Sequence, residues 1–205
     1  FIGTAVRQEI RRHVTSTGAE PDEETRRRIR ADIMCRLRGT VQADILKEVQ
    51  AQNETLFPTQ PSLRLLGDMV EYCVNHLPRW YPISISGYHI AEAGATPIEQ
   101  LAFTLGNGLF YVDMFRRRGL NLDKVVPRLS FFFQFDHDLE SAVVGRVARR
   151  LWAISMRDQF GVDPDRAQLK RVLIEADGKA VYDSDLKPDD QRVLADVWLA
   201  PSAHL

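Results

Sequence analysis

The sequence has few of the features that mark a disulfide-rich, membrane-spanning or nucleic-acid-binding protein. Its 205 residues include only two cysteines, Cys35 and Cys73, without metal or redox spacing, so we expect both to be reduced and buried. No apolar run approaches the length of a bilayer span, and the N-terminal residues lack the apolar core of a secretory signal, which predicts a cytoplasmic location. The net charge of -1 provides no electrostatic footprint for nucleic acid.

The sequence does not indicate a metal site. The metal-like run Asp136-His137-Asp138 places its side chains at a helix start, where adjacent residues do not converge on one ion. Short arginine clusters at 26–28, 116–118 and 149–150 are typical of solvated helix faces. With 44% apolar and 27% charged residues, the composition is that of one globular domain with a core.

Strand and helix patterns alternate three times in the middle of the chain, which is typical of a parallel α/β sheet or barrel. We expect short strands near 37–42, 81–86 and 127–133, and helices near 44–52, 62–76, 98–118 and 139–160. The last helix is expected to bury Val143, Val147, Leu151 and Ile154, which recur at helical spacing.

The two ends of the chain have a different character. Residues 1–36 predict a helical N-terminal extension, with a helix at about 4–13 and a second one opened by Pro21 and Asp22. Residues 162–205 form a divergent C-terminal segment. This segment predicts strands at 171–175 and 179–182 around an Asp177-Gly178 turn, and a short helix at 187–197.

Three motifs, RGTVQADILKE from Arg38, ISISGYHIAEAGAT from Ile83 and PRLSFFF from Pro127, carry a family resemblance. In this order and spacing they resemble the substrate barrel of the adenosylcobalamin-dependent acyl-CoA mutases, over the segment 37–161. The resemblance implies a partial (β/α) TIM-barrel segment with about three βα units, since a complete barrel has eight strands. The ends outside 37–161 show no family pattern.

The family also implies a cofactor, adenosylcobalamin. The D-x-H-x-x-G motif whose histidine ligates cobalt is absent from these residues, so a separate domain or subunit is expected to supply the cofactor.

The resemblance implies two catalytic residues and two cofactor-binding residues. His89 matches the histidine that contacts the thioester carbonyl, where an imidazole can polarise the oxygen. Tyr88 matches an aromatic residue near corrin and substrate, and Glu92 and Ala51 match cofactor-binding positions. The alternatives are a histidine satisfied at a strand end, a core tyrosine and an exposed helix carboxylate.

Four further residues match substrate positions. Thr40 and Gln42 correspond to a polar pair that binds substrate and CoA, and strand alternation places residues two apart on one face. Arg128 and Ser130 have the same spacing and match CoA contacts. A guanidinium group can pair with phosphate in a forked geometry, although Arg128 could instead cap a surface strand.

Gln52 is the position that separates substrates. Methylmalonyl-CoA mutases carry an arginine there, which pairs with the substrate carboxylate, and a buried carboxylate without a cation is costly. Glutamine at this position is similar to the isobutyryl-CoA branch of the family and disfavours substrates with a free carboxylate.

Two functions remain open at this stage. The first is part of a cobalamin-dependent acyl-CoA mutase of the isobutyryl-CoA/butyryl-CoA type, which rearranges a carbon skeleton through radicals. The second is a non-catalytic acyl-CoA-binding or oligomerisation module derived from that barrel. A partial barrel exposes strand edges, so we expect a homo- or hetero-oligomer that includes a cobalamin-binding subunit.

Overall fold

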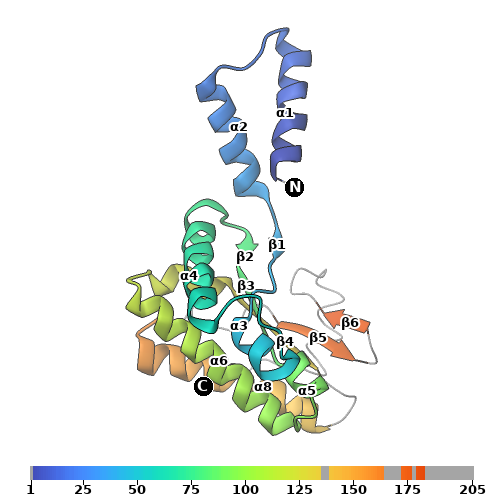
Figure 1. Ribbon diagram of the computed structural model, residues 1–205, viewed down its shortest axis with the longest axis vertical. Helices are drawn as coiled ribbons and strands as arrows, with labels where there is room; N and C mark the ends of the chain where they lie inside the picture. The colour runs from blue at the N-terminus through green and yellow to red at the C-terminus, as the bar shows by residue number, and fades with distance from the viewer. Residues whose placement is uncertain (1, 135–138, 164–171, 177–178, 183–205) are drawn as a thin grey trace.

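The N-terminal extension is a helical hairpin that projects from the body of the protein (Figure 1). The computed structural model describes residues 2–134, 139–163, 172–176 and 179–182. Helix α1 (Ile2–Thr17) is longer than expected and buries no residue. Helix α2 (Glu23–Arg36) begins where the sequence predicts, because the Asp22 side chain accepts a hydrogen bond of 2.8 Å from the Thr25 amide.

The body is a partial α/β barrel segment, as expected. Strands β1 and β2 pair in parallel, and a second sheet has the order β3-β4-β5-β6, with β6 antiparallel to β5. The elements are β1 (Gly39–Thr40), α3 (Ile45–Lys47), the π-helical turn η1 (Glu48–Gln52), α4 (Thr59–His76), β2 (Trp80–Tyr81), β3 (Ile83–Ser86), α5 (Tyr88–Glu92), α6 (Pro97–Arg117), α7 (Leu122–Val125), the 3-10 turn η2 (Val126–Arg128), β4 (Leu129–Gln134), α8 (Leu139–Phe160), β5 (Val172–Ala176) and β6 (Lys179–Tyr182).

The predicted C-terminal hairpin forms from β5 and β6. Its turn residues, the predicted helix at 187–197 and the Asp136-His137-Asp138 run lie outside the described residues. Within the described residues, no helix is long and apolar enough to cross a membrane.

The two faces of β3 and β4 differ in polarity because side chains alternate along a strand. One face carries Ile83, Ile85, Leu129, Phe131 and Phe133, all members of the buried apolar core. The opposite face carries Ser84 and Ser86 on β3 and Ser130 on β4, all buried. Small polar side chains therefore line the inner face of the barrel segment.

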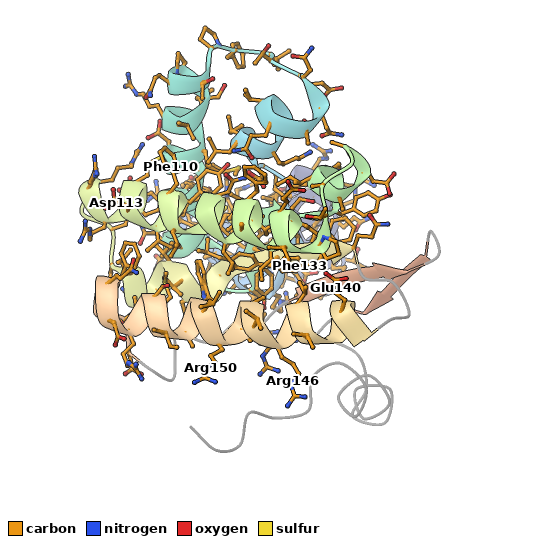
Figure 2. The ribbon with its side chains drawn as sticks, turned by 90° about the horizontal axis from the view of Figure 1, so that it is seen from below. Phe110, Asp113, Phe133, Glu140, Arg146 and Arg150 are labelled. Carbon is orange, nitrogen blue, oxygen red and sulfur yellow. The ribbon has the colours of Figure 1, made fainter. Side chains whose placement is uncertain are left out.

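A glycine sets the packing of α8 against α6, and the two helices lie side by side (Figure 2). A Cβ atom at Gly108 would lie 2.8 Å from the ring of Trp152, so only glycine leaves room for this ring. Trp152 is 1% exposed and its ring meets Phe131 edge-on at 4.8 Å. Arg146 and Arg150, on the far side of α8, point away from α6 (Figure 2).

The expected inward face of α8 is wrong, although the bounds of the helix are as predicted. The buried residues are Val144, Ala148, Trp152 and Met156. Val143, Val147 and Leu151 are exposed, and Ile154 is half-buried. The buried stripe is rotated by one residue because the Trp152 ring occupies the space above Gly108.

Both cysteines are free, as expected, but the prediction of burial is correct for one of them only. Cys73, on α4, is buried, whereas Cys35 is exposed on the projecting helix α2. On α2 only Ile33 and Met34 are buried, because one face of the helix contacts the body.

Candidate functional site

The Tyr-His pair stands at the carboxyl end of β3, where Gly87 turns the chain into α5. The Gly87 amide donates a hydrogen bond of 2.7 Å to the Phe132 carbonyl, which joins this turn to β4. A Cβ atom at Gly87 would lie 2.4 Å from the Thr104 hydroxyl oxygen on α6. Glycine therefore lets the turn pass close to α6 and places Tyr88 and His89 at the edge of the barrel segment.

His89 is half-buried and held from two sides. Its Nδ1 atom lies 2.6 Å from the Ser86 hydroxyl oxygen. The ring of Tyr88 meets His89 edge-on at 5.2 Å and stacks on Phe132 at 4.9 Å. Burial lowers the pKa of His89, and the Lys47 cation acts in the same direction. The ring is therefore neutral at pH 7, and Nε2 is the nitrogen available to a ligand.

Asp44 connects three elements behind His89. It is buried, and its carboxylate accepts hydrogen bonds from the Tyr111 hydroxyl at 2.5 Å and from the Ser86 amide at 2.8 Å. It also caps α3 by accepting from the Lys47 amide at 3.3 Å. Burial raises the pKa of Asp44, while the bonds from Tyr111 and Ser86 oppose that shift. This carboxylate fixes the end of β3 relative to α6.

A buried cation lies beside Gln52. The Lys47 side chain is 2% exposed, and its Nζ atom lies 2.6 Å from Glu48 Oε1. The same ammonium group donates to the side-chain oxygen of Gln52. The turn η1 ends at Gln52 and is followed by Asn53, whose φ of 52° is in the left-handed region. Lys47 thus places a cation near position 52, although Glu48 neutralises it.

A basic cavity of about 360 Å³ lies at the opposite, amino end of the strands. Its lining residues directly precede β1 and β4 or flank the start of β2, and are Arg38, Pro78, Arg79, Tyr81, Pro127 and Arg128. The guanidinium group of Arg128 donates a hydrogen bond of 2.9 Å to the Leu77 carbonyl. The path from Tyr81 to Ser86 has five residue steps and spans about 17 Å at the rise of an extended strand.

Hydroxyl groups lie between these two ends. The Ser130 hydroxyl donates a hydrogen bond of 2.9 Å to the Ile83 carbonyl. The hydroxyl oxygens of Thr40 and Ser84 are buried without a hydrogen-bond partner in the part of the chain that the structure describes. Buried polar groups are almost always paired, so two such oxygens, one on β1 and one on β3, indicate a place for a polar ligand.

The predicted residues are therefore distributed along the strands. Tyr88, His89 and Glu92 on α5 lie next to η1, which carries Ala51 and Gln52. Arg128 lies at the opposite end, and Thr40 and Ser130 lie on the strands. Gln42 is exposed and follows β1, which ends at Thr40, so strand alternation does not extend to it.

Sequence reasoning missed four residues of this site: Asp44, Lys47, Ser86 and Phe132. The alternation Ile83-Ser84-Ile85-Ser86 was a usable signal, because small polar residues recur on every second position of a buried strand. Asp44 stands directly before a helix, which marks a capping residue. Lys47 left no signal, since lysine is rarely buried.

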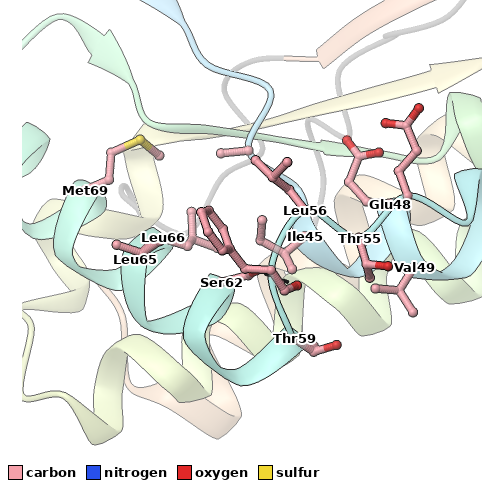
Figure 3. Close-up of a pocket in the computed structure, with 13 residues that line it drawn as sticks. Ile45, Glu48, Val49, Thr55, Leu56, Thr59, Ser62, Leu65, Leu66 and Met69 are labelled. Carbon is pink, nitrogen blue, oxygen red and sulfur yellow. Dashed lines mark hydrogen bonds between the residues drawn. The ribbon is translucent and has the colours of Figure 1, made fainter.

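A second pocket lies between α4 and the segment that holds α3 and η1 (Figure 3). It has a volume of about 400 Å³ and a largely apolar lining that includes Ile45, Val49, Leu56, Leu65 and Met69. The predicted substrate residues lie elsewhere. Within the described residues, no group of three or more His, Cys, Asp or Glu side chains could hold a metal ion.

The fold and site together define a segment of an α/β barrel with a histidine at the carboxyl end of its strands. The sequence profile of the methylmalonyl-CoA mutase family matches residues 29–187, and the chain belongs to this family. The match extends beyond 37–161 at both ends, so the expectation that the flanks carry no family pattern is wrong.

Curated relatives agree with this assignment. The chain is 46% identical to the fused isobutyryl-CoA mutase of Cupriavidus metallidurans, over 98% of this chain and 18% of that protein. It is 44% identical to the 2-hydroxyisobutanoyl-CoA mutase large subunit of Aquincola tertiaricarbonis, over 66% of this chain and 24% of that protein. It is 38% identical to human mitochondrial methylmalonyl-CoA mutase, over 73% of this chain and 20% of that protein. The chain thus spans about a fifth of these relatives.

Proposed function

We propose that this chain forms the acyl-CoA-binding part of a cobalamin-dependent mutase of the isobutyryl-CoA type. The observation that carries the proposal is the polar path from the arginine cavity, past the unpartnered hydroxyls of Thr40 and Ser84, to His89. An extended CoA thioester has phosphates at one end, amides along its linker and a carbonyl at the other. The path offers cations, hydroxyls and an imidazole in the same order.

In this proposal, Arg128 binds the phosphates of CoA together with its neighbours Arg38 and Arg79. Three guanidinium groups in one cavity suit phosphate because each can donate in a forked geometry. Thr40, Ser84 and Ser130 bind the amide groups of the linker, and Gln42 lies beyond them on the exposed loop. The hydroxyl oxygens of Thr40 and Ser84 have no partner in the described part of the chain, and the amide groups of such a ligand would supply one.

His89 donates a hydrogen bond from Nε2 to the thioester carbonyl. A neutral imidazole that donates to this oxygen stabilises negative charge that accumulates on it during a rearrangement. Tyr88, which stacks on Phe132, covers one side of the acyl group and excludes water from it. The roles of His89 and Tyr88 are therefore to hold and shield the reacting end.

Gln52 faces the acyl end and selects against a carboxylate. Gln52 is exposed and its side-chain oxygen accepts a hydrogen bond from Lys47, so its amide nitrogen is the group left to meet the acyl end. The nearby charge of Lys47 is already compensated by Glu48, so a substrate carboxylate would lack a cation of its own. Isobutyryl-CoA, with a methyl group there, avoids this cost.

Ala51 and Glu92 fit one edge of adenosylcobalamin. Both lie on the rim that carries His89, one with a small side chain and the other with an exposed carboxylate that can accept from amide groups. When bound, the cofactor supplies the radical that abstracts hydrogen from the substrate. A cobalamin-binding subunit or domain would present it, and the exposed strand edges of a partial barrel favour a homo- or hetero-oligomer.

Isothermal titration with isobutyryl-CoA and, separately, methylmalonyl-CoA tests the proposal. We expect binding of the first and at least about tenfold weaker binding of the second, because a buried unpaired carboxylate is costly. Arg128→Gln should weaken isobutyryl-CoA binding by about tenfold or more, since charge-assisted hydrogen bonds are lost. Arg150→Gln, on the outward side of α8, is the matched control. Failure of both ligands to bind, or equal binding by both variants, overturns the proposal.

A further inference from the structure

The hydroxyl group of Ser86 has two possible arrangements with His89, and they differ in where the ring carries its proton. Ser86 can donate to Nδ1, in which case a neutral ring carries its proton on Nε2. Alternatively, Nδ1–H donates to the Ser86 oxygen, and the serine proton then needs another acceptor. The 2.6 Å separation is compatible with both arrangements.

Burial decides between them. Ser86 is 0% exposed, so water does not reach its hydroxyl group. In the part of the chain that the structure describes, Nδ1 of His89 is the only hydrogen-bond partner of this hydroxyl. The second arrangement would leave a buried O–H group without an acceptor, which shifts the equilibrium by about tenfold or more toward the first.

The position of Ser86 is itself fixed. Its amide donates a hydrogen bond of 2.8 Å to the buried Asp44 carboxylate. That carboxylate also accepts a hydrogen bond from Tyr111 on α6. The next amide, that of Gly87, donates a hydrogen bond of 2.7 Å to the Phe132 carbonyl on β4. The backbone that carries the hydroxyl is thus held at a rigid strand end, next to the imidazole.

We propose that Ser86 is a positioning residue for His89: its buried hydroxyl donates to Nδ1 and keeps the ring proton on Nε2, facing the ligand. The proposal rests on the proposed function for its purpose, because only a ring with Nε2–H can donate to a thioester carbonyl while neutral. Asp44 acts one step behind, by holding the backbone of Ser86. Neither residue contacts the substrate.

The test is ¹⁵N nuclear magnetic resonance of the 205-residue chain labelled at histidine, at a pH where the ring is neutral. Loss of a signal in His89→Gln assigns His89 among the five histidines. We expect the Nε2–H pattern in the unmodified chain and an averaged pattern of both tautomers in Ser86→Ala. Ser84→Ala removes a buried hydroxyl from the same strand face and should leave the pattern unchanged.

Two results overturn the inference: an Nδ1–H pattern in the unmodified chain, or an identical pattern in Ser86→Ala. If circular dichroism shows that Ser86→Ala does not fold, the tautomer of His89 in the unmodified chain still tests the inference. The readout needs no mutase activity, so it can fail while acyl-CoA binding succeeds. With the cobalamin-binding partner present, Ser86→Ala should lower kcat by about tenfold and change KM less, because the bond from Nε2 is strongest when negative charge accumulates on the carbonyl oxygen.

Discussion

Two glycines in α6 offer a direct test of how the helices pack on the sheet. Gly106 and Gly108 lie two residues apart in the same helix, so a change to alanine has the same local chemistry at both. A Cβ atom at Gly106 meets no heavy atom within 4 Å in the described part of the chain. A Cβ atom at Gly108 would lie 2.8 Å from Trp152 and 3.2 Å from Phe131.

The two substitutions should change stability in opposite directions. Alanine stabilises a helix interior by about 1 kcal/mol relative to glycine, so Gly106→Ala should stabilise the protein by about that amount. At Gly108 the same gain is offset by overpacking, which costs about 1–3 kcal/mol. Trp152 cannot move away easily, because it is buried against Phe131. We therefore expect Gly108→Ala to be about 2 kcal/mol less stable than Gly106→Ala.

Urea unfolding followed by circular dichroism and tryptophan fluorescence measures this difference. Equal m values in the two variants would show that the midpoints report stability alone. Equal midpoints would refute the reasoning, because they would mean that Trp152 does not pack over Gly108. The assignment of the buried face of α8 would then be wrong as well.

Three further changes test the site. Tyr111→Phe should destabilise the protein by about 1–3 kcal/mol in urea unfolding, because the buried Asp44 carboxylate loses a donor and the Leu46 amide loses its acceptor. Lys47→Met should raise the pKa of His89 in an NMR titration, because the Lys47 cation lowers it. The folded-state pKa of His89 is below its ordinary value of 6.5, so its contribution to stability is full above that pH and is lost as pH falls through the folded pKa. The free energy of unfolding should therefore fall less between neutral pH and about pH 5 in His89→Gln than in the unmodified chain.

Each of these expectations has a clear contrary result. Tyr72→Phe, at a half-exposed tyrosine on α4, is the control for Tyr111→Phe, and equal stability of the two would contradict the role of the Asp44 bond. Lys124→Met on α7 is the control for Lys47→Met, and an unchanged or lower pKa of His89 would exclude the charge effect. Parallel pH profiles for His89→Gln and the unmodified chain would show that His89 titrates alike in both states.

Local signals were sufficient for the bounds of the two long helices α6 and α8. The bounds of α8 match the predicted helix, and α6 begins at Pro97 behind the Thr96 cap, as Pro at a first helical position indicates. These features depend on residues close together in the chain, where period and capping chemistry act. The segment near 44–52 was predicted as one helix, and the structure divides it into α3 and the π-helical turn η1. The pattern contained no sign of that division.

The sequence by itself determined the alternation of strands and helices, the family motifs, and the residue types available to bind an acyl-CoA. Only the tertiary structure decided which face of α8 is buried, because the space above Gly108 is made by three elements distant in sequence. The same holds for the surroundings of His89. Asp44, Ser86 and Tyr111 are linked by hydrogen bonds between side chains and backbone up to 67 residues apart, and no local pattern specifies such contacts. Burial of Lys47 likewise follows from packing, since a lysine in a short helix is ordinarily solvated.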